Sequence, residues 1–324
     1  CSTNNSSDMD HSDMDHSDMD HSDMDHSDMD HSDMDHSDMD HSDMDHSDMD
    51  HSDMEKPIPD TKVQKEVKQQ SFSDKIKQWH DQGIKGENVK IAVLDTGIDT
   101  DSKDLTYVKG VNFVGKDREN FEDDNGHGTK ISGIIAALEN DYNLLGVSPS
   151  SQLYVAKVAD KNGNVKVEEL VKGINWAIKE DVDIINISLE FPRGTKNLHK
   201  VIKKAHKKGI IVVSSSGNIN SPNDTKLSYP GAYSEVINVG MLDTDGKIYS
   251  EEFKEKKVNV YAPGEDIFSM YLNDKMTLDT GVSFATAYTT GYTALLINHH
   301  KNQNESYNVK TLQTDFKKYL APKK

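Results

Sequence analysis

The sequence predicts an α/β fold in which a doubly wound, mostly parallel sheet carries helices on both faces, preceded by a disordered tail of repeats. Three observations favour this class. Near-continuous apolar runs such as "NVKIAVLD" (88–95) and "VDIINIS" (182–188) are typical of strands that are buried on both faces. These runs alternate along the chain with amphipathic segments of helical period. Polar residues follow several of the runs, as expected at the carboxyl edge of a parallel sheet.

The predicted elements follow one another in a regular alternation. The first is a short capped helix over 71–83, which ends at Gly83. The rest, in order, are a strand at 88–95, a helix near 129–139, a strand at 151–158, a helix at 167–180, a strand at 182–188, a basic amphipathic helix at 196–208, strands at 209–216, 235–240 and 257–264, and helices at 283–298 and 306–319.

The N-terminal part of the chain is a low-complexity repeat. From Ser7 to His51 it consists of nine copies of the pentad SDMDH, followed by "SDME". A five-residue period matches neither a helix nor a strand, and no aliphatic run is present, so we expect residues 1–55 to be disordered. Residues 56–70 are polar with two prolines and are expected to be a linker. Residues 71–324 are long enough for one large α/β domain.

The formal net charge of −19 belongs to the tail. Residues 1–55 hold 19 Asp, one Glu and no Lys or Arg, and the other 36 acidic and 37 basic residues leave 56–324 with a net charge of +1. No basic stripe with interleaved aromatic residues occurs in this body, so nothing in the charge pattern indicates a nucleic-acid partner. We expect a monomer that binds no nucleic acid.

The single cysteine is Cys1. "CSTNNSS" followed by a low-complexity spacer resembles the mature start of a bacterial lipoprotein, whose cysteine carries acyl chains. This resemblance implies an extracytoplasmic protein that is anchored to the membrane through a lipid on Cys1. No later stretch approaches the ~18 apolar residues of a spanning helix, so we expect an anchored protein and not a threaded one. The alternative is that Cys1 marks only an arbitrary cut.

Two roles are open for the repeats. Asp, Met and His in repetition offer ligands for Cu, Zn or Ni, although a disordered chain provides no fixed coordination geometry and the affinity should be low. The favoured role is a spacer, because residues 1–55 can extend to about 180 Å and their like charges promote extension.

Three polar residues lie at positions where the functional groups of a parallel α/β sheet usually lie. Asp95 ends the strand "KIAVLD", His127 begins a helix in "NGHGTK", and Ser283 begins another in "DTGVSFATAYTTG". A serine hydroxyl is a poor nucleophile until a base removes its proton, and that base needs a third group to fix its tautomer. Each signal is weak alone, because an Asp after a strand is usually a turn former or a helix cap. Gly126 and Gly128 leave the imidazole bare, and we interpret them as room for substrate and Ser283 to reach it.

Together, the order and flanks of these residues resemble the subtilisin-like serine proteases. The resemblance runs from about Trp79 to Asn298 and includes "LDTGID", "NGHGTK", "LGVSPSSQLYVAKV", "DIINISL", "VVSSSGN" and "VYAPGEDIFS". It implies that Asp95 orients the imidazole, that His127 is the general base and then the acid, and that Ser283 attacks the carbonyl. It further implies that the Asn218 side-chain amide and the Ser283 N–H donate to the oxyanion.

The same resemblance implies that substrate binds as an added extended strand. One side of the binding groove would lie around Ser188 and Leu189, and the other at Gly163, Asn164 and Val165. Ser228 falls where a small residue lets the primary pocket stay deep. "SLE" replaces the family's usual "SLG", which places Glu190 at the rim of this pocket. A carboxylate there would favour a basic side chain before the scissile bond. The alternative is that Glu190 points into water and selects nothing, since one solvated carboxylate contributes ~1 kcal/mol or less.

A cation site is also predicted. "ALENDYNLLG" resembles the loop that wraps calcium in many subtilisins. The resemblance implies that Asn140 gives a side-chain oxygen, that Leu138, Tyr142 and Leu144 give backbone carbonyls, and that Asp104 gives a carboxylate. Calcium takes six to eight oxygens, which such a loop can supply. The alternative is a metal-free polar loop.

The predicted function is that of a membrane-tethered, extracytoplasmic serine endopeptidase without a catalytic cofactor, acting on an extended peptide or protein. Two roles compete within it: a processing enzyme, like the leader peptidases that mature lantibiotic-type peptides, and a general surface protease. Glu190 favours the first. The hypothesis from a different class is a non-catalytic binding lipoprotein with a metal-binding tail, and the four intact catalytic positions weigh against it.

Overall fold

The computed structural model of the protein describes residues 74–142, 144–219 and 225–320. The chain divides into two units, 1–51 and 52–324, and every described residue belongs to the second. The predictions on Cys1, on the tail 1–55 and on the linker 56–70 therefore lie outside the described residues, and they stay predictions.

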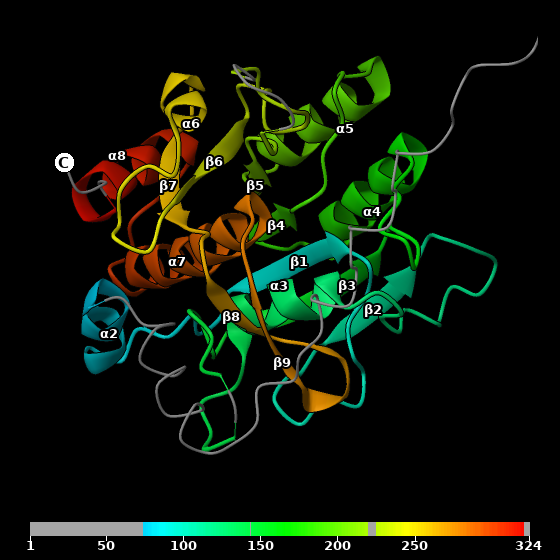
Figure 1. The fold of residues 1–324 in the computed structure, drawn as a ribbon, viewed down its shortest axis with the longest axis horizontal. Coiled ribbons are helices and arrows are strands. Elements are labelled where there is room, and N and C mark those ends of the chain that lie inside the picture. Colours follow the sequence, from blue (N-terminus) through cyan, green and yellow to red (C-terminus); the bar gives the residue numbers. More distant parts are fainter. Residues whose placement is uncertain (1–73, 143, 220–224, 321–324) are drawn as a thin grey trace, which may run out of the picture. The chain divides into compact units, whose positions relative to one another are not determined.

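A seven-stranded parallel sheet forms the centre of the domain (Figure 1). Its strand order is β2-β3-β1-β4-β5-β6-β7, so the chain starts in the middle, winds to one edge and then returns to build the other. The strands are β1 (Lys90–Asp95), β2 (Lys109–Asn112), β3 (Gln152–Lys157), β4 (Ile184–Ile187), β5 (Ile211–Ser215), β6 (Val236–Leu242) and β7 (Val260–Pro263). This doubly wound order confirms the predicted fold class.

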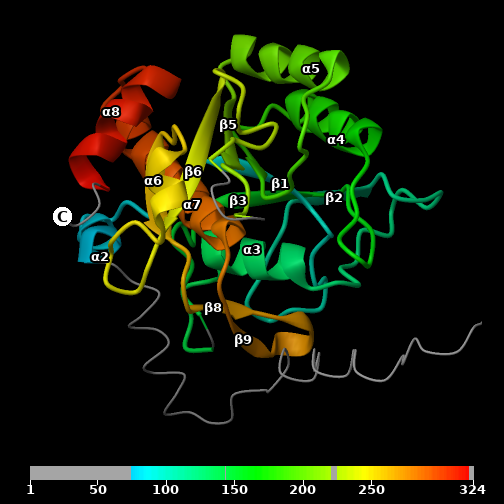
Figure 2. The same cartoon turned by 45° about the horizontal axis from the view of Figure 1, so that its top comes forward.

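Helices cover both faces of the sheet. Figure 2 shows α4 (Val167–Lys179) and α5 (Lys196–Lys207) on one side, and α3 (His127–Ala136) on the other. The two apolar layers divide β1 by alternation, because Ile91 and Val93 pack in one cluster while Ala92 and Leu94 pack in the other. The further helices are α2 (Asp74–Asp81), α6 (Glu251–Glu255), α7 (Val282–Asn302) and α8 (Val309–Tyr319), with a 3-10 turn, η2 (Leu272–Asp274).

The longest described helix, α7, runs through the core and carries Ser283 in its first turn. Almost every side chain on it is buried. Three of its threonines donate their hydroxyls to the helix backbone, as Thr286 does to the Val282 carbonyl at 2.9 Å, and the Thr290 hydroxyl donates to the Asn186 side chain at 2.7 Å. These internal bonds allow a polar helix to be buried without unsatisfied hydroxyls. Within the described ranges, no helix is both long and apolar enough to span a bilayer.

Each predicted strand and helix is present, with ends that differ by a few residues from the predicted ones. The elements that the sequence pattern did not indicate are β2, α6 and the antiparallel hairpin of β8 (Ile267–Met270) and β9 (Met276–Asp279). All are five residues or shorter, and β9 has no buried position. Elements of this length have too little apolar periodicity to be recognised.

Candidate active site

The candidate catalytic residues lie where the parallel strands end. Asp95 is the last residue of β1, and Asn218 follows the end of β5 by three residues. His127 is the first residue of α3, and Ser283 is the second residue of α7. Because α3 and α7 pack against each other on one face of the sheet, their starts can share one edge with the ends of β1 and β5.

Asp95 and His127 form the best defined pair of the site. The Nδ1 atom of His127 lies 2.7 Å from Oδ1 of Asp95, whose side chain is fully buried while that of His127 is 29% exposed. Burial of the ring opposes protonation, but the charge of Asp95 and its hydrogen bond outweigh this effect, so the pKa of His127 is raised above its ordinary value. The ring is thus held through Nδ1, and Nε2 is the nitrogen that remains for a substrate or nucleophile.

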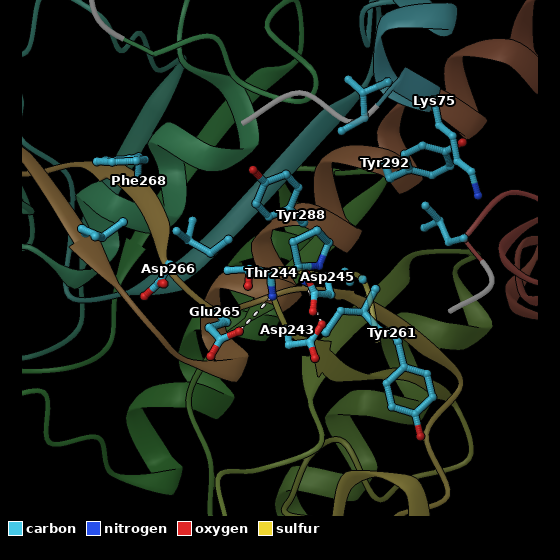
Figure 3. A pocket seen from close by; sticks show the side chains of 18 residues that line it. Lys75, Asp243, Thr244, Asp245, Tyr261, Glu265, Asp266, Phe268, Tyr288 and Tyr292 are labelled. Atoms are coloured by element: carbon cyan, nitrogen blue, oxygen red, sulfur yellow. Dashed lines mark hydrogen bonds between the residues drawn. The ribbon is translucent and has the colours of Figure 1, made fainter. Parts of the chain in front are cut away.

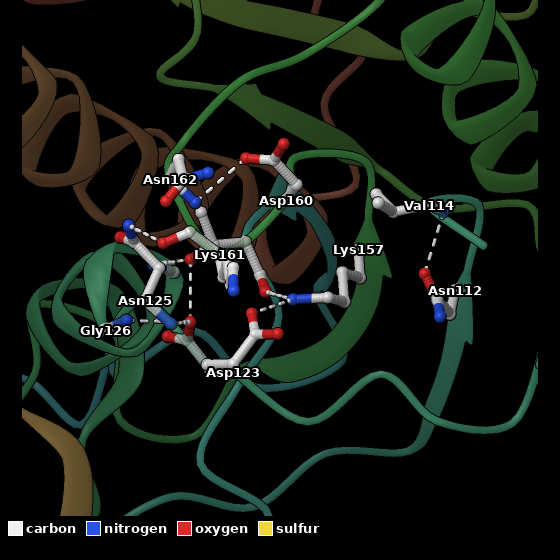
Figure 4. Close-up of polar contacts among 12 residues, drawn as sticks. Asn112, Val114, Asp123, Asn125, Gly126, Lys157, Asp160, Lys161 and Asn162 are labelled. Atoms are coloured by element: carbon white, nitrogen blue, oxygen red, sulfur yellow. Dashed lines mark hydrogen bonds and ion pairs between the residues drawn. The ribbon is translucent and has the colours of Figure 1, made fainter.

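Asp123 organises the turn that leads into His127 (Figure 4). Its Oδ1 accepts the N–H groups of Asn125 and Gly126 at 3.0 and 2.8 Å, and its Oδ2 accepts the N–H and the hydroxyl of Thr129 at 2.9 and 2.7 Å. Burial alone would raise the pKa of Asp123, but these hydrogen bonds outweigh it and lower the pKa. The sequence pattern did not single out this residue.

Thr96 ties this turn to the end of β1. Its hydroxyl donates to Oδ1 of Asp123 at 2.8 Å and accepts the N–H of Gly128 at 2.8 Å. The buried Lys157 adds a second tie, because its Nζ donates to the Thr96 carbonyl at 2.5 Å and to Oδ1 of Asp124 at 2.6 Å. The start of α3 is therefore fixed to β1 by several buried bonds, independently of His127.

The reason predicted for Gly126 and Gly128 needs correction. A Cβ on Gly126 would lie 2.1 Å from the Tyr271 ring, and Gly126 has a φ of 101°, which favours glycine. A Cβ on Gly128 would lie 2.2 Å from the backbone carbonyl of Gly97. Close packing of the protein itself accounts for both glycines, without any need for room around a substrate.

Ser283 lies near this pair without a hydrogen bond to it. The ring of the adjacent Phe284 is 6.3 Å from the His127 ring, centroid to centroid, and the Ser188 hydroxyl donates to the Ser283 carbonyl at 3.4 Å. Among the described residues no hydrogen bond joins the Ser283 hydroxyl to His127. The Ser283 N–H belongs to the first turn of α7, whose amide groups have no partners within the helix.

Asn218 donates two hydrogen bonds to Glu190. Its backbone N–H and its side-chain Nδ2 donate to Oε2 and Oε1 of Glu190, both at 3.0 Å. Asn218 is exposed, and Glu190 is partly buried. The structure thus matches neither a Glu190 that points freely into water nor one that leaves the Asn218 amide open.

The other predicted pocket residues come together around Gly217. A Cβ on Gly217 would lie 2.1 Å from the Ser228 hydroxyl and 2.8 Å from Oε2 of Glu190, which places both side chains against the same backbone. Ser188 and the buried Leu189 immediately precede Glu190. These residues therefore form one continuous wall beside Asn218.

The predicted opposite side of the groove is a tight exposed turn. Asp160 closes it, because its Oδ1 accepts the N–H of Asn164 at 2.9 Å and its carbonyl accepts that of Gly163 at 2.9 Å. Val165 pairs with Ala159 in an isolated antiparallel bridge. The Asn125 side chain donates to the Lys161 carbonyl at 2.9 Å, so this turn is attached directly to the segment before His127 (Figure 4).

A buried lysine contacts the backbone of the loop that carries Asn218. Lys256 is 2% exposed, and its Nζ donates to the carbonyls of Ser216, Gly217 and Asn218 at 3.3, 3.2 and 3.4 Å. The sequence pattern does not single out this residue. Its setting, "FKEKKVNV", is a run of charges that ordinarily indicates a solvated surface.

The predicted cation loop folds back on Asp104. This fully buried residue accepts the Leu138 N–H on its carbonyl at 2.9 Å and the Leu144 N–H on Oδ2 at 3.2 Å. The Asn140 side-chain oxygen accepts the Tyr142 N–H at 2.9 Å. Over the described ranges no cluster of three or more His, Cys, Asp or Glu side chains is placed to hold a metal, so a cation here would depend on carbonyl oxygens. One buried carboxylate, one amide oxygen and three carbonyls are a donor set that fits calcium.

A separate cavity of about 630 Å³ lies beside β6, β7 and α7 (Figure 3). Acidic residues, among them Asp243 and Glu265, stand near aromatic ones such as Tyr288, and the Thr244 N–H donates to Glu265 at 2.9 Å. None of the candidate catalytic residues lines this cavity. It is therefore not the site in which Asp95 and His127 act.

Comparison with known proteins points to one family. The Subtilase family (Peptidase S8) model matches residues 86–318, and a Pentapeptide repeat model matches residues 17–55 in eight copies. The chain is 38% identical to subtilisin of Bacillus pumilus over 222 residues, which are 68% of this chain and 81% of that one. It is 40% identical to the intracellular serine protease of Paenibacillus polymyxa over 65% of this chain and 67% of that one. Subtilisin E of Bacillus subtilis is 37% identical over 68% of this chain, and the match spans 58% of the length of subtilisin E.

Proposed function

This chain belongs to the subtilase family and is a subtilisin-like serine peptidase, and we propose that Asp95, His127 and Ser283 form its catalytic triad. The observation that carries the proposal is the 2.7 Å contact between the buried Asp95 carboxylate and Nδ1 of His127. It fixes the tautomer in which Nε2 can accept a proton. The hydroxyl of Ser283, at the start of α7, is the proposed nucleophile.

In this mechanism His127 Nε2 takes the proton of the Ser283 hydroxyl as Oγ attacks the substrate carbonyl carbon. The charge that develops on the carbonyl oxygen is stabilised by the Ser283 N–H and by the Asn218 amide. Collapse of the intermediate breaks the C–N bond, and the leaving amine takes the proton from His127. Water then attacks the acyl-enzyme carbonyl while His127 takes a proton from it, the ester bond to Ser283 Oγ breaks, and His127 returns the proton to the serine. The bond between Ser283 and His127 forms when substrate closes the site, as is common for catalytic hydrogen bonds.

Labelling with a fluorophosphonate tests this assignment. We expect one equivalent of label on the folded, calcium-loaded protein and none on Ser283→Ala. Ser234→Ala is the matched control, because Ser234 is a surface serine whose hydroxyl donates to Glu235, and it should label like the parent. Absence of label from the folded parent protein would refute the triad and favour the alternative, a non-catalytic binding protein.

We propose an extended peptide or protein as substrate, bound between the Ser188–Leu189 segment and the turn at Gly163, Asn164 and Val165. Glu190, Gly217 and Ser228 share one wall, which supports a pocket with a carboxylate for a basic residue before the scissile bond. A selective pocket favours a processing protease, such as a leader peptidase, over a general surface protease. A peptide library that compares Arg, Lys, Leu and Phe at this position tests the preference, and equal cleavage of all four would favour the general protease.

We further propose that the loop at 138–144 holds a structural calcium ion. Asp104, the Asn140 side chain and the carbonyls of Leu138, Tyr142 and Leu144 would bind it, and the ion would stabilise the folded state by binding it selectively. At 100 times the Kd the gain would be about 2.7 kcal/mol. Thermal unfolding with calcium or with chelator tests this, and Asp104→Asn should lose the calcium-dependent shift while Asp117→Asn keeps it.

An extracytoplasmic, lipid-anchored location remains a proposal. It rests on the resemblance of the "CSTNNSS" segment to a lipoprotein start, because the matched relatives carry names of both kinds, including an intracellular serine protease and a minor extracellular protease of Bacillus subtilis. Metabolic labelling with palmitate tests it. Label that disappears in Cys1→Ser would support the anchor, and an unlabelled parent protein would remove it.

A further inference from the structure

The contacts between Glu190 and Asn218 occupy the side-chain amide that the proposed reaction needs. Nδ2 of Asn218 donates to Oε1 of Glu190 and its N–H donates to Oε2, both at 3.0 Å. Such paired hydrogen bonds to a carboxylate are stronger than bonds between neutral groups. While they persist, the Asn218 amide is directed at a side chain of the protein and not at a substrate oxygen.

The charge of Glu190 adds to this effect. A carboxylate within hydrogen-bond distance of the oxyanion donor lies close to the point where negative charge develops in the transition state. Like charges at short range disfavour each other, most strongly where water is excluded. Glu190 in this position therefore removes a donor and also opposes the oxyanion.

We propose that Glu190 is a reversible clamp on Asn218, and that a positively charged side chain before the scissile bond opens it. The cation draws the carboxylate into the pocket, and the Asn218 amide becomes free for the oxyanion. Specificity would then act on the chemical step as well as on binding, because only the correct substrate completes the oxyanion site. This inference rests on the proposed roles of Asn218 and Ser283.

The surroundings indicate that the moving part is the Glu190 side chain and not the Asn218 loop. Lys256 is buried, and its Nζ donates to the carbonyls of Ser216, Gly217 and Asn218. The backbone of Ser216 is also bonded to the N–H of Ser228 at 3.1 Å. The Glu190 carboxylate, by contrast, has hydrogen bonds only to Asn218 among the described residues. Breaking two partly exposed bonds thus frees the amide without disturbing the loop.

Peptide substrates that differ only in arginine or citrulline before the scissile bond provide the test, because citrulline is a neutral isostere of arginine. In the parent protein we expect the arginine substrate to be favoured in kcat as well as in KM. In Glu190→Gly, kcat for citrulline should rise at least about fivefold, the value of one hydrogen bond of ordinary strength, while kcat/KM for arginine falls. Glu119→Gly, in an exposed loop, is the control and should change neither.

A second experiment combines Glu190→Gly with Asn218→Ala, which removes the proposed oxyanion donor. With the donor absent, adding Glu190→Gly should raise kcat for citrulline less than it does in the parent protein, because only the effect of the charge remains, so the two changes are coupled in the double-mutant cycle. A citrulline kcat that is unchanged or lower in Glu190→Gly alone, together with weaker arginine cleavage, would overturn the clamp and leave Glu190 as a simple pocket charge. Absence of fluorophosphonate labelling in all variants would instead refute the proposed function itself.

Discussion

The two halves of the candidate site are built differently. On the imidazole side, Asp95 and Asp123 are buried, and a dense set of hydrogen bonds joins them to His127, Thr96 and the start of α3. On the oxyanion side, Asn218 is exposed and its amide is held by a single partly buried carboxylate. The hydrogen bonds of the first half are set by the fold, while the second half has a contact that, in the proposed clamp, a substrate replaces.

In the proposed mechanism, this difference separates proton transfer by His127 from the selection of substrates by Glu190 and Asn218. A general base works only in one tautomer and orientation, so it benefits from contacts that cannot rearrange. An oxyanion donor that is released by the substrate can discriminate between substrates at some cost in rate. We therefore expect mutations of the buried carboxylates, which form several hydrogen bonds, to differ in their effects on activity and stability from mutation of the exposed Asn218 amide, which is bonded to one carboxylate.

The largest expected effect comes from Asp95→Asn. The amide retains the shape of the carboxylate but stabilises the wrong tautomer of His127, so kcat should fall about 10⁴-fold. Peptide hydrolysis under saturating substrate measures this fall, and an unchanged unfolding midpoint would show that the fold is intact. A loss smaller than tenfold would mean that the buried pair does not act in catalysis.

The pH dependence of kcat/KM also tests the imidazole side of the site. His127 must be neutral to act as base, and Asp95 holds its pKa above the ordinary value. The acidic limb of kcat/KM should therefore have its midpoint above about pH 6.5. Asp95→Asn removes the charge that raises this pKa, so the residual activity should show a limb at lower pH. An acidic limb that does not move would assign it to another group.

On the oxyanion side, Asn218→Ala should lower kcat about 10²- to 10³-fold for an arginine substrate, the usual cost of one oxyanion donor. Because Asn218 is exposed and the truncation removes only its side-chain bond to the partly buried Glu190, the free energy of unfolding should change by no more than about 0.5 kcal/mol. Steady-state kinetics and denaturant unfolding on the same preparation measure both quantities. Equal losses of activity and stability would remove the distinction between the two halves.

Asp123→Asn tests whether the imidazole side is also a structural unit. The Asp123 carboxylate accepts four hydrogen bonds besides the one from Thr96. Its replacement by an amide should therefore lower the free energy of unfolding by about 1–3 kcal/mol at pH 7. Since the folded pKa of Asp123 is lowered, its contribution is present above the unfolded pKa near 4 and is lost as pH falls through the folded value. The difference between parent and variant should therefore shrink in acid. Urea unfolding at pH 7 and pH 3 measures it, with Asp117→Asn as an exposed control.

The sequence predicted more of the fold than of the contacts in the site. The apolar runs and helical periods place the strands and helices, and the motifs place Asp95, His127 and Ser283 at one sheet edge, because these features are local and periodic. Asp123 and Lys256 were missed because each acts through backbone groups distant in sequence or in a turn, which leaves no pattern of residue types. The contact between Glu190 and Asn218 joins residues 28 positions apart, and only the folded chain shows that Glu190, the proposed pocket carboxylate, bonds to Asn218, the proposed oxyanion donor. The packing reason for Gly126 and Gly128 depends likewise on Tyr271 and Gly97.

The smallest expected effect is on the stability of Glu190→Gln. An exposed or partly exposed charge contact contributes about 0–1 kcal/mol, so removal of the charge should change the free energy of unfolding by less than about 1 kcal/mol. Lys256 still holds the three carbonyls of the loop, and the amide oxygen that this substitution introduces can accept one of the two bonds. Urea unfolding beside Asp123→Asn measures the contrast. If Glu190→Gln costs as much stability as Asp123→Asn, the carboxylate is part of the architecture of the loop. A substrate could then displace it only by partly unfolding the loop, and the two halves of the site would be equally rigid.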